Sequence, residues 1–250
     1  MMRFLLTIQY LGTNYSGWQT QANATGIQQV VEEALGSLCN ATIRIEGAGR
    51  TDSGVHALGQ MAHVDVPIDI EPRGLMLAVN TRLPDDVRVA GAEQVPDNFH
   101  ARFEAKEKTY LYQIWNGETK DVFLAPTHAH VIPLLDERSM NRAAAALMGT
   151  HDFASYTVAS PEVSSTIRQV RAISVEEDTR ARPQGRVIRV RITADGFLRY
   201  MVRRIAGSLI EVGRGSLDES AVVRSLEPTL EPARWTAPPH GLTLLSVRYR

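Results

Sequence analysis

The sequence predicts an α+β fold of two similar lobes, each an antiparallel sheet with helices packed on one face. Segments in which every second residue is apolar, as in half-buried strands, alternate with segments in which apolar residues recur every three or four positions, as in helices. The same order of elements restarts after a polar connector at 96–98, without visible sequence identity between the halves. We therefore expect lobes at residues 1–97 and 98–250, with a cleft between them that holds the functional site.

In the first half, the predicted order is strand, helix, strand, strand, helix and strand. Phe4, Leu6 and Ile8 share one face of a strand at 3–10. After a loop rich in Gly, Asn and Ser, a helix opens at Thr25 and Gly26, because the apolar residues that follow recur at helical spacing. The other predicted elements are strands near 41–45, at 61–66 and at 87–92, and a helix at 71–80.

The second half repeats this mixture of strands and helices. A strand is predicted at 109–115, where both faces can be apolar, and an alanine-rich helix at 140–148. Further strands are predicted at 170–175, 186–193 and 242–247, with a helix at 198–212. On this last helix we expect four residues away from the apolar face: Arg203, Arg204, Ser208 and Glu211.

The composition, 44% hydrophobic and 22% charged, is that of a soluble globular protein. The apolar run near the N-terminus, residues 4–8, is far shorter than the ~18 residues of a membrane span. Gln9 and Tyr10 follow it where a signal peptide would have a small-residue cleavage site, so we expect a cytoplasmic protein without a membrane partner. The single cysteine, Cys39, excludes an intramolecular disulfide and is predicted to be a buried structural thiol.

The charge balance does not by itself indicate a polyanionic partner, because the formal net charge is −1. However, only three of the 27 basic residues are lysines, Lys106, Lys108 and Lys120, and arginine binds phosphate in bidentate fashion. An arginine excess is equally consistent with genomic composition. The location of the arginines must therefore decide between these interpretations.

The loop at 47–60, GAGRTDSGVHALGQ, has three candidate interpretations. A phosphate cradle is disfavoured, because the glycines do not have G-x-G-x-x-G spacing and a strand pattern follows the loop. A structural turn would use Asp52 to accept backbone N–H bonds and Ser53-Gly54 to make the bend. A catalytic carboxylate would act as nucleophile or general base, with Arg50 nearby to keep it ionised. Two charged residues between core strands favour the third interpretation.

Residues 49–56, GRTDSGVH, resemble the G-R-T-D-A/S-G-V-H motif of the tRNA pseudouridine synthase A family. Further segments resemble motifs of the same family, in order and spacing: residues 10–19 (Y-x-G-x-x-Y/F-x-G-W/F-Q), 99–103 (F-H-A-R-F), 108–112 (K/R-x-Y-x-Y), 152–156 (D-F-x-S-F) and 201–209 (M-V-R-x-I/M-x-G-x-L). The resemblance therefore extends over nearly the whole chain.

The resemblance implies an isomerase that converts uridine to pseudouridine at positions 38, 39 and 40 of the tRNA anticodon stem-loop, with base flipping and neither cofactor nor metal. By the motif, Asp52 is the catalytic residue that detaches uracil from ribose and supports its rejoining through C5. Arg50 inserts where the target nucleotide has left its stack, and Tyr110 packs on the target ring. Arg203 pairs with Asp52 and keeps it ionised. Without the resemblance, Tyr110 would be assigned to the core and Arg203 to a solvated helix face.

The resemblance also implies a homodimer that reads the shape of one tRNA across both subunits. Basic residues then gather in two places, at 100–108 around the predicted lobe junction and at 168–171, so a positive cleft is compatible with the acidic remainder. The candidate RNA-binding residues are Phe99, His100, Ala101, Arg102, Phe103, Lys106, Lys108, Arg168 and Arg171.

Departures from the family pattern leave the catalytic positions unchanged. Ser53 replaces a commoner Ala, and Leu111 and Gln113 alter the outer face of their strand. His128 and His130 have H-x-H spacing without a third ligand, so they are predicted to be surface histidines. Two other functions stay open: a glycosyl hydrolase, which would release free base, and a non-catalytic RNA-binding module, which would leave tRNA unchanged.

Overall fold

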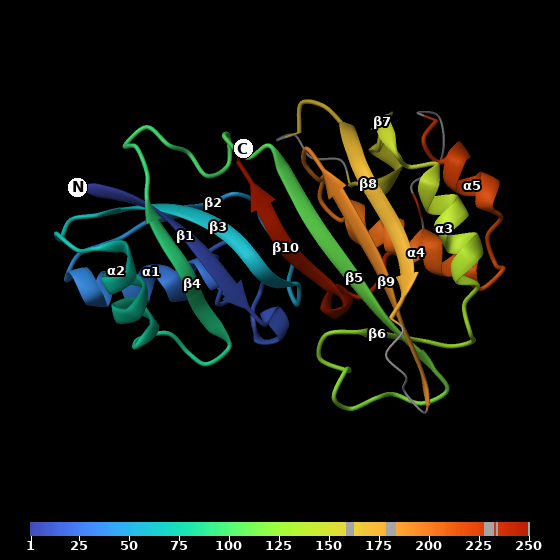
Figure 1. Ribbon diagram of the computed structural model, residues 1–250, viewed down its shortest axis with the longest axis horizontal. Helices are drawn as coiled ribbons and strands as arrows, with labels where there is room; N and C mark the ends of the chain where they lie inside the picture. Colours follow the sequence, from blue (N-terminus) through green and yellow to red (C-terminus); the bar gives the residue numbers. More distant parts are fainter. Residues whose placement is uncertain (159–162, 179–183, 228–232, 234, 250) are drawn as a thin grey trace. The chain divides into compact units, whose positions relative to one another are not determined.

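The computed structural model describes residues 1–158, 163–178, 184–227, 233 and 235–249, and these have the predicted α+β fold (Figure 1). The chain divides into two compact units: unit 1 is Met1–Lys106 with Thr243–Arg250, and unit 2 is Glu107–Leu242. These bounds differ from the predicted lobes 1–97 and 98–250. The last strand belongs to unit 1 because its Thr243 and Leu244 pair with His56 and Ala57. The segment up to Lys106 is bonded to this strand, with the Lys106 N–H donating to the Arg248 carbonyl at 2.8 Å.

Unit 1 contains a sheet with the strand order β4-β1-β3-β10, and β2 also pairs with β3. Strand β1 is antiparallel to β3 and β4, whereas β10 is parallel to β3. The strands are β1 (Met2–Tyr10), β2 (Ile45–Gly47), β3 (His56–Val66), β4 (Val87–Gln94) and β10 (Leu242–Arg248), and the helices are α1 (Ile27–Cys39) and α2 (Pro72–Asn80). Helix α2 packs on β4 and on α1.

Both faces of β1 contribute to the core of unit 1. Phe4, Leu6 and Ile8 are fully buried on one face, as their alternation predicts. Leu5 points to the opposite face and packs with Ala48 and Ala101, which belong to segments far apart in the sequence. This second cluster holds the segment after β4 against the sheet.

Unit 2 contains an antiparallel sheet with the order β5-β9-β8-β7, to which β6 adds in parallel beside β5. Its strands are β5 (Glu107–Gly117), β6 (Ala129–Val131), β7 (Gly149–Asp152), β8 (Ile167–Glu177) and β9 (Gly185–Ala194). Its helices are α3 (Glu137–Ala145), α4 (Met201–Gly213) and α5 (Glu219–Arg224). Helix α3 packs on β8, α4 and α5, and α4 packs on β5, so the helices form one layer (Figure 1).

The long elements are confirmed to within a few residues, whereas the short ones differ. Strand β3 begins at His56, so residues 56–60, predicted as part of the loop, belong to the strand. Strand β2 lies at Ile45–Gly47, later than the predicted strand near 41–45. Strands β6 and β7 and helix α5 are three to six residues long, too short to show a hydrophobic period in the sequence.

Three predictions about burial need correction. Ser208 of α4 is buried, because a small side chain fits against the core where a larger polar one would not. Cys39 is only half-buried at the end of α1. His128, predicted to lie on the surface, is buried, and its ring hydrogen-bonds the Gln113 side chain at 2.9 Å. His130 is half-buried, and its Nε2 lies 2.7 Å from the Gly117 carbonyl.

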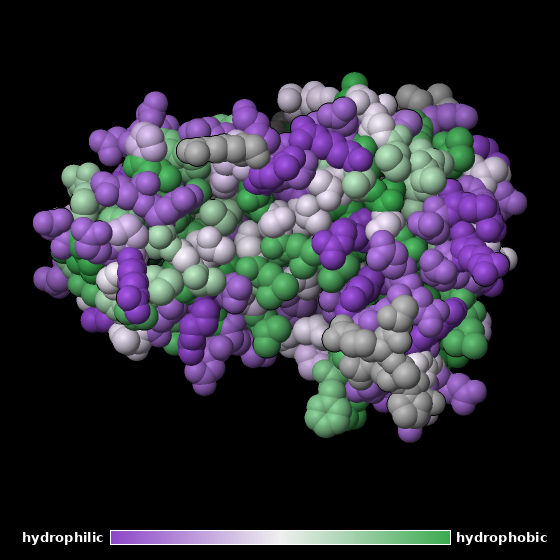
Figure 2. Space-filling view, in the orientation of Figure 1, coloured by the Kyte–Doolittle hydropathy of each residue, from purple (hydrophilic) through white to green (hydrophobic). Residues whose placement is uncertain are grey.

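Within the described part of the chain, none of the helices is both long enough and apolar enough to cross a membrane. On the face seen in Figure 2, hydrophilic residues are spread over the surface, with hydrophobic residues in smaller groups among them.

Candidate active site

The loop between β2 and β3 carries Arg50 and Asp52 and is anchored from within. Thr51 and Val55 are buried, Asp52 between them is half-buried, and Arg50 is exposed. The backbone of this loop is therefore held by the core, whereas Asp52 itself is partly exposed to solvent.

Hydrogen bonds fix the loop on both sides of Asp52. The hydroxyls of Thr51 and Tyr10 share a bond of 2.8 Å, and the Trp18 N–H donates to the Thr51 carbonyl at 3.1 Å. The Val55 N–H donates to the Asp52 carbonyl at 3.1 Å, which closes a turn in which Gly54 has the left-handed φ of 77°. Burial raises the pKa of the Tyr10 hydroxyl to about 12, so Tyr10 stays neutral as a hydrogen-bonding partner.

The segment after β1 packs directly against this loop. Gly17 has a φ of 89°, and a Cβ at this position would lie 2.6 Å from the Thr51 carbonyl oxygen. The Gly12 N–H donates to Nδ1 of the buried His56 at 2.9 Å. The first motif, at 10–19, therefore shapes the backbone around Asp52, a function that the sequence does not reveal.

Strand β3 supports the other side of the loop. Gln60 is completely buried, and its side-chain amide donates to the Gly49 carbonyl at 2.9 Å. A buried amide without a partner would be costly, so this bond fixes the place where the loop begins. His56 and Gln60 were missed in the sequence because a polar residue inside a strand looks like a loop residue.

Tyr110 and Arg203 lie in unit 2, each fixed by its surroundings there. Tyr110 of β5 pairs with Ile192 of β9, is buried, and meets the Phe197 ring edge-on at a centroid distance of 5.1 Å. Arg203 lies in the first turn of α4 and donates through Nε to the Ala237 carbonyl at 2.9 Å. Its guanidinium also lies 5.3 Å from the centre of the Tyr200 ring.

Comparison with known proteins identifies the family. The sequence model of a family described as tRNA pseudouridine synthase matches residues 6–104 and 143–250. The chain belongs to the tRNA pseudouridine synthase family. It is 40% identical to tRNA pseudouridine synthase A of Geobacter sulfurreducens and 39% identical to that of Ruminiclostridium cellulolyticum, in both cases over 100% of each chain. It is also 39% identical to that of Methylacidiphilum infernorum, over 98% of this chain and 95% of the relative.

The match to the tRNA pseudouridine synthase family model includes Arg50, Asp52 and Arg203 but not Tyr110. Tyr110 lies in the gap at 105–142, although the full-length relatives align across it. The roles that the resemblance gives to these residues stay predictions.

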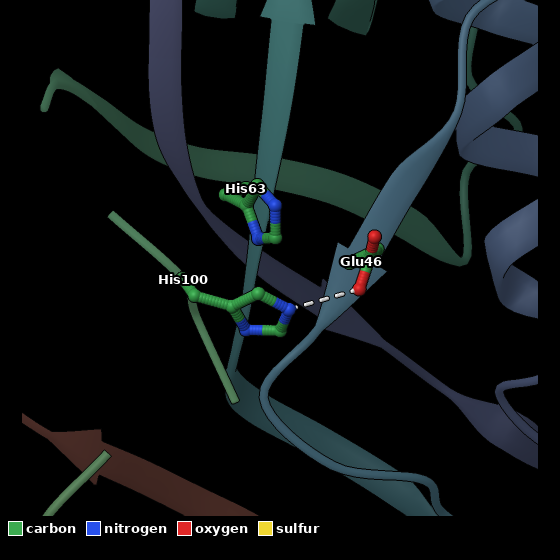
Figure 3. A group of neighbouring side chains, drawn as sticks. All are labelled: Glu46, His63 and His100. Carbon is green, nitrogen blue, oxygen red and sulfur yellow. Dashed lines mark ion pairs between the residues drawn. The ribbon is translucent and has the colours of Figure 1, made fainter. Parts of the chain in front are cut away.

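Beside β3, three side chains meet that no sequence motif connects: Glu46, His63 and His100 (Figure 3). Each offers one potential metal-ligating atom, and these atoms lie within 4.8 Å of one another. Glu46 is opposite His63 in the pairing of β2 with β3, and its carboxylate lies 3.1 Å from Nε2 of His100. The pairing of β2 with β3 brings Glu46 and His63 together, and the turn at 99–103 adds His100; no local sequence pattern predicts either.

The hydrogen bonds of both rings oppose a metal at this place. Nδ1 of His63 accepts the Ala101 N–H, and Nδ1 of His100 accepts the Arg102 N–H, both at 3.2 Å. A neutral ring that accepts at Nδ1 carries its proton on Nε2. A metal on Nε2 would move that proton to Nδ1, where it would face a backbone N–H. The arrangement instead suits a His100 ring that donates to Glu46.

The burial of His63 predicts a pH-dependent stability. Burial, followed by the charges of His100 and Arg3, lowers the pKa of His63. The unfolded chain therefore binds more protons than the folded one below the ordinary histidine pKa of about 6.5, and the folded state loses stability as the pH falls through this range. In His63→Asn, whose side-chain oxygen can still accept the Ala101 N–H, the free energy of unfolding measured with urea from neutral to mildly acidic pH should fall less steeply. Equal slopes in both proteins would contradict this assignment.

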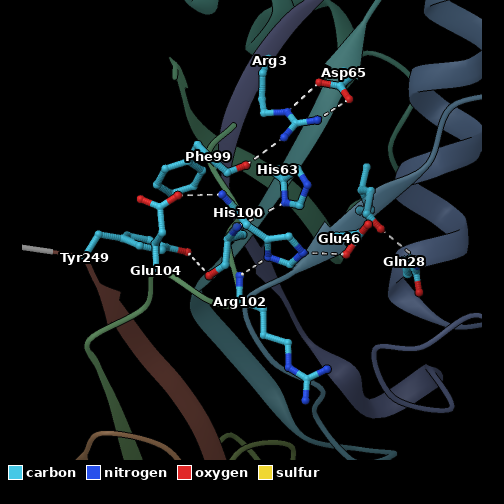
Figure 4. Close-up of polar contacts among 12 residues, drawn as sticks. Arg3, Gln28, Glu46, His63, Asp65, Phe99, His100, Arg102, Glu104 and Tyr249 are labelled. Carbon is cyan, nitrogen blue, oxygen red and sulfur yellow. Dashed lines mark hydrogen bonds and ion pairs between the residues drawn. The ribbon is translucent and has the colours of Figure 1, made fainter. Parts of the chain in front are cut away.

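The candidate RNA-binding residues at 99–103 form a turn on unit 1 (Figure 4). Phe99 is half-buried against the Tyr249 ring, and its carbonyl accepts from Arg3 at 3.0 Å. Ala101 is completely buried against Leu5, so its side chain cannot contact RNA, contrary to the prediction. The exposed residues of the turn are Arg102 and Phe103.

The basic candidates do not form one cluster within a unit. Lys106 is exposed on unit 1, whereas Lys108 is half-buried on β5 of unit 2. Arg171 is exposed on β8 and forms an ion pair with Glu107 at 3.0 Å, which reduces the local positive charge. Arg168 is half-buried on the same strand and donates to the Ser165 carbonyl at 2.9 Å.

Proposed function

We propose that this chain converts uridine to pseudouridine in tRNA, at positions 38, 39 and 40 of the anticodon stem-loop. Family membership supports the reaction, and relatives at about 40% identity bear the name tRNA pseudouridine synthase A. The observation that carries the proposal is the GRTDSGVH loop, in which a firmly held backbone fixes the position of the half-buried Asp52.

The reaction is an isomerisation whose atoms balance without a co-reactant. The bond between C1′ and N1 breaks, the base turns, and a bond forms between C1′ and C5. The hydrogen on C5 leaves as a proton, and N1 gains a proton. Asp52 would assist either as a nucleophile or as a base, and both roles need an ionised carboxylate that does not move while the base turns.

The other site residues receive the roles that their motifs imply. Arg50, exposed beside Asp52, would fill the space left by the flipped nucleotide. Tyr110 would pack on the target ring, and its contact with Phe197 supports a fixed ring orientation. Arg203 would keep the catalytic carboxylate ionised, and its bond to the Ala237 carbonyl supports a fixed guanidinium.

The partners follow from the proposed reaction. The RNA would be bound by Phe99, His100, Arg102, Phe103, Lys106, Lys108, Arg168 and Arg171, without Ala101. We further propose that two copies of the chain bind one tRNA by its shape and that the enzyme acts in the cytoplasm. Sedimentation of the protein with and without tRNA tests the dimer.

The decisive experiment uses tRNA transcripts that carry tritium at C5 of uridine. Formation of the new carbon bond should release tritium to water, and transcripts with a single uridine at position 38, 39 or 40 should each release it. Release of free uracil would indicate a glycosyl hydrolase. Binding without either product would indicate a non-catalytic RNA-binding module, and reaction only at other positions would refute the assigned site.

A further inference from the structure

Phe103 is an exposed aromatic residue whose ring lies beside the His100 ring. It is 74% exposed, yet the His100 ring lies 4.2 Å from it between centroids, at an angle of 33°. The Arg102 guanidinium lies 5.8 Å from the centre of the Phe103 ring. Phe103 thus lies next to the His100 ring and the Arg102 guanidinium, while most of its surface faces water.

The turn that carries Phe103 is rigidly fastened to unit 1. The His100 N–H donates to the Glu104 carboxylate at 2.8 Å, and the Glu104 N–H donates to the His100 carbonyl at 3.1 Å (Figure 4). Ala101, in the middle of the turn, is completely buried, and its carbonyl accepts the Tyr249 hydroxyl at 2.9 Å. A partner that binds here would therefore lose little free energy to ordering the turn.

Three rings form a series that leads from the sheet to the surface. His63 on β3 is 4.8 Å from His100, and His100 is 4.2 Å from Phe103. Nε2 of the His100 ring lies 3.1 Å from the Glu46 carboxylate and its Nδ1 accepts the Arg102 N–H, so the middle ring of the series keeps its orientation. The series ends at an exposed aromatic surface that can accept one more flat ring.

The charges around this turn favour stacking over the binding of several phosphates. Arg102 and Lys106 are exposed and positive, whereas Glu46 and Glu104 are exposed and negative. The two signs nearly balance, so the turn offers one well-placed cation next to a ring, not a basic patch. This combination is typical of sites that hold a single unpaired base and its phosphate.

We propose that the exposed side of Phe103 stacks on an unpaired base of the RNA substrate, with Arg102 binding the adjacent phosphate. This proposal rests on the proposed function, because it takes tRNA to be the ligand. It adds a contact outside the uridine that reacts, and so it predicts an effect on binding that does not depend on the chemical step.

The test measures the affinity of the full chain for an unmodified tRNA transcript. Phe103→Leu should weaken binding about 5- to 150-fold, the range for loss of one base stack. Phe103→Trp should retain the affinity and add a fluorescence signal that tRNA quenches. Phe123→Leu is the matched control, since Phe123 is 89% exposed in unit 2, and it should bind as the wild type does.

Arg102→Gln should reduce the slope of log affinity against log salt by about 1.

Two outcomes would overturn the proposal. Wild-type affinity in Phe103→Leu would show that no base stacks there. A loss of self-association in Phe103→Leu, with unchanged RNA affinity, would show instead that Phe103 contacts a second copy of the chain.

Comparing the tRNA affinity with and without Phe103→Leu in an Asp52→Asn background separates this proposal from the proposed function, because binding is then measured without turnover. Thermal unfolding of each variant verifies folding, and Phe103→Tyr should restore affinity if loss of the ring is the cause.

Discussion

Replacing Asp52 with asparagine or alanine should lower the rate of pseudouridine formation by at least about 10³-fold, with tRNA affinity near that of the wild type. Asparagine keeps the shape of the side chain but can neither attack as a nucleophile nor accept a proton as a carboxylate does. The loop should stay folded, because backbone bonds and the bonds of the Thr51 and Gln60 side chains, which do not use the Asp52 carboxyl group, hold it in place. Tritium release under single-turnover conditions measures the loss.

A matched substitution shows whether that loss is specific. Asp85→Asn removes an exposed carboxylate that forms a surface ion pair with Arg88 at 2.9 Å, and such pairs contribute little. Its tritium release should equal that of the wild type. If Asp52→Asn retained a tenth or more of the wild-type rate, the carboxylate would not be the catalytic group, and the loop would instead have the structural role of a turn.

Gly17→Ala should reduce the catalytic rate about 100-fold although residue 17 has no part in the chemistry. An added Cβ would lie 2.6 Å from the Thr51 carbonyl oxygen and 3.1 Å from the Asp52 carbonyl carbon. The loop must then move outward, and a shift of about 1 Å at a catalytic group is enough for such a loss. The left-handed φ of 89° adds a further strain of about 1–2 kcal/mol to the folded state.

Gly215→Ala separates these two effects. Gly215 has a φ of 71°, so alanine is strained there as well, but a Cβ at Gly215 would meet no atom within 4 Å. Both variants should therefore lose stability in urea unfolding, whereas only Gly17→Ala should lose tritium-release activity. Equal activity in the two variants would mean that the close approach of Gly17 does not position Asp52.

The long elements were predictable because each carries its own periodic signal. The alternation of Phe4, Leu6 and Ile8 and the helical spacing of Ile27, Val31 and Leu35 depend only on neighbours in the sequence, and all six residues are buried. The return of β10 to pair in parallel with β3 was not predictable, because the strand pattern at 242–247 does not indicate which strand it joins. The division of the chain into units follows from that pairing.

The candidate site was predictable to a different extent. The motif at 49–56 and its resemblance to a family pointed to Asp52, but the support from Tyr10, Gly17 and Gln60 depends on contacts between distant segments. Ala101 was assigned to RNA because it lies between His100 and Arg102 in the motif, whereas the turn directs its side chain into the core. A motif identifies which residues occur together, and the fold decides which of them face outward.

The order of synthesis gives the division of the chain a consequence for the cell. Unit 2 is made between the two segments of unit 1, so β10 leaves the ribosome only after all of unit 2. Until then, the start of β3 at His56 and Ala57 has an unpaired edge on the side where Thr243 and Leu244 will bind. An open strand edge can pair with another chain, so a ribosome that stalls late on this message exposes a nascent protein prone to aggregation.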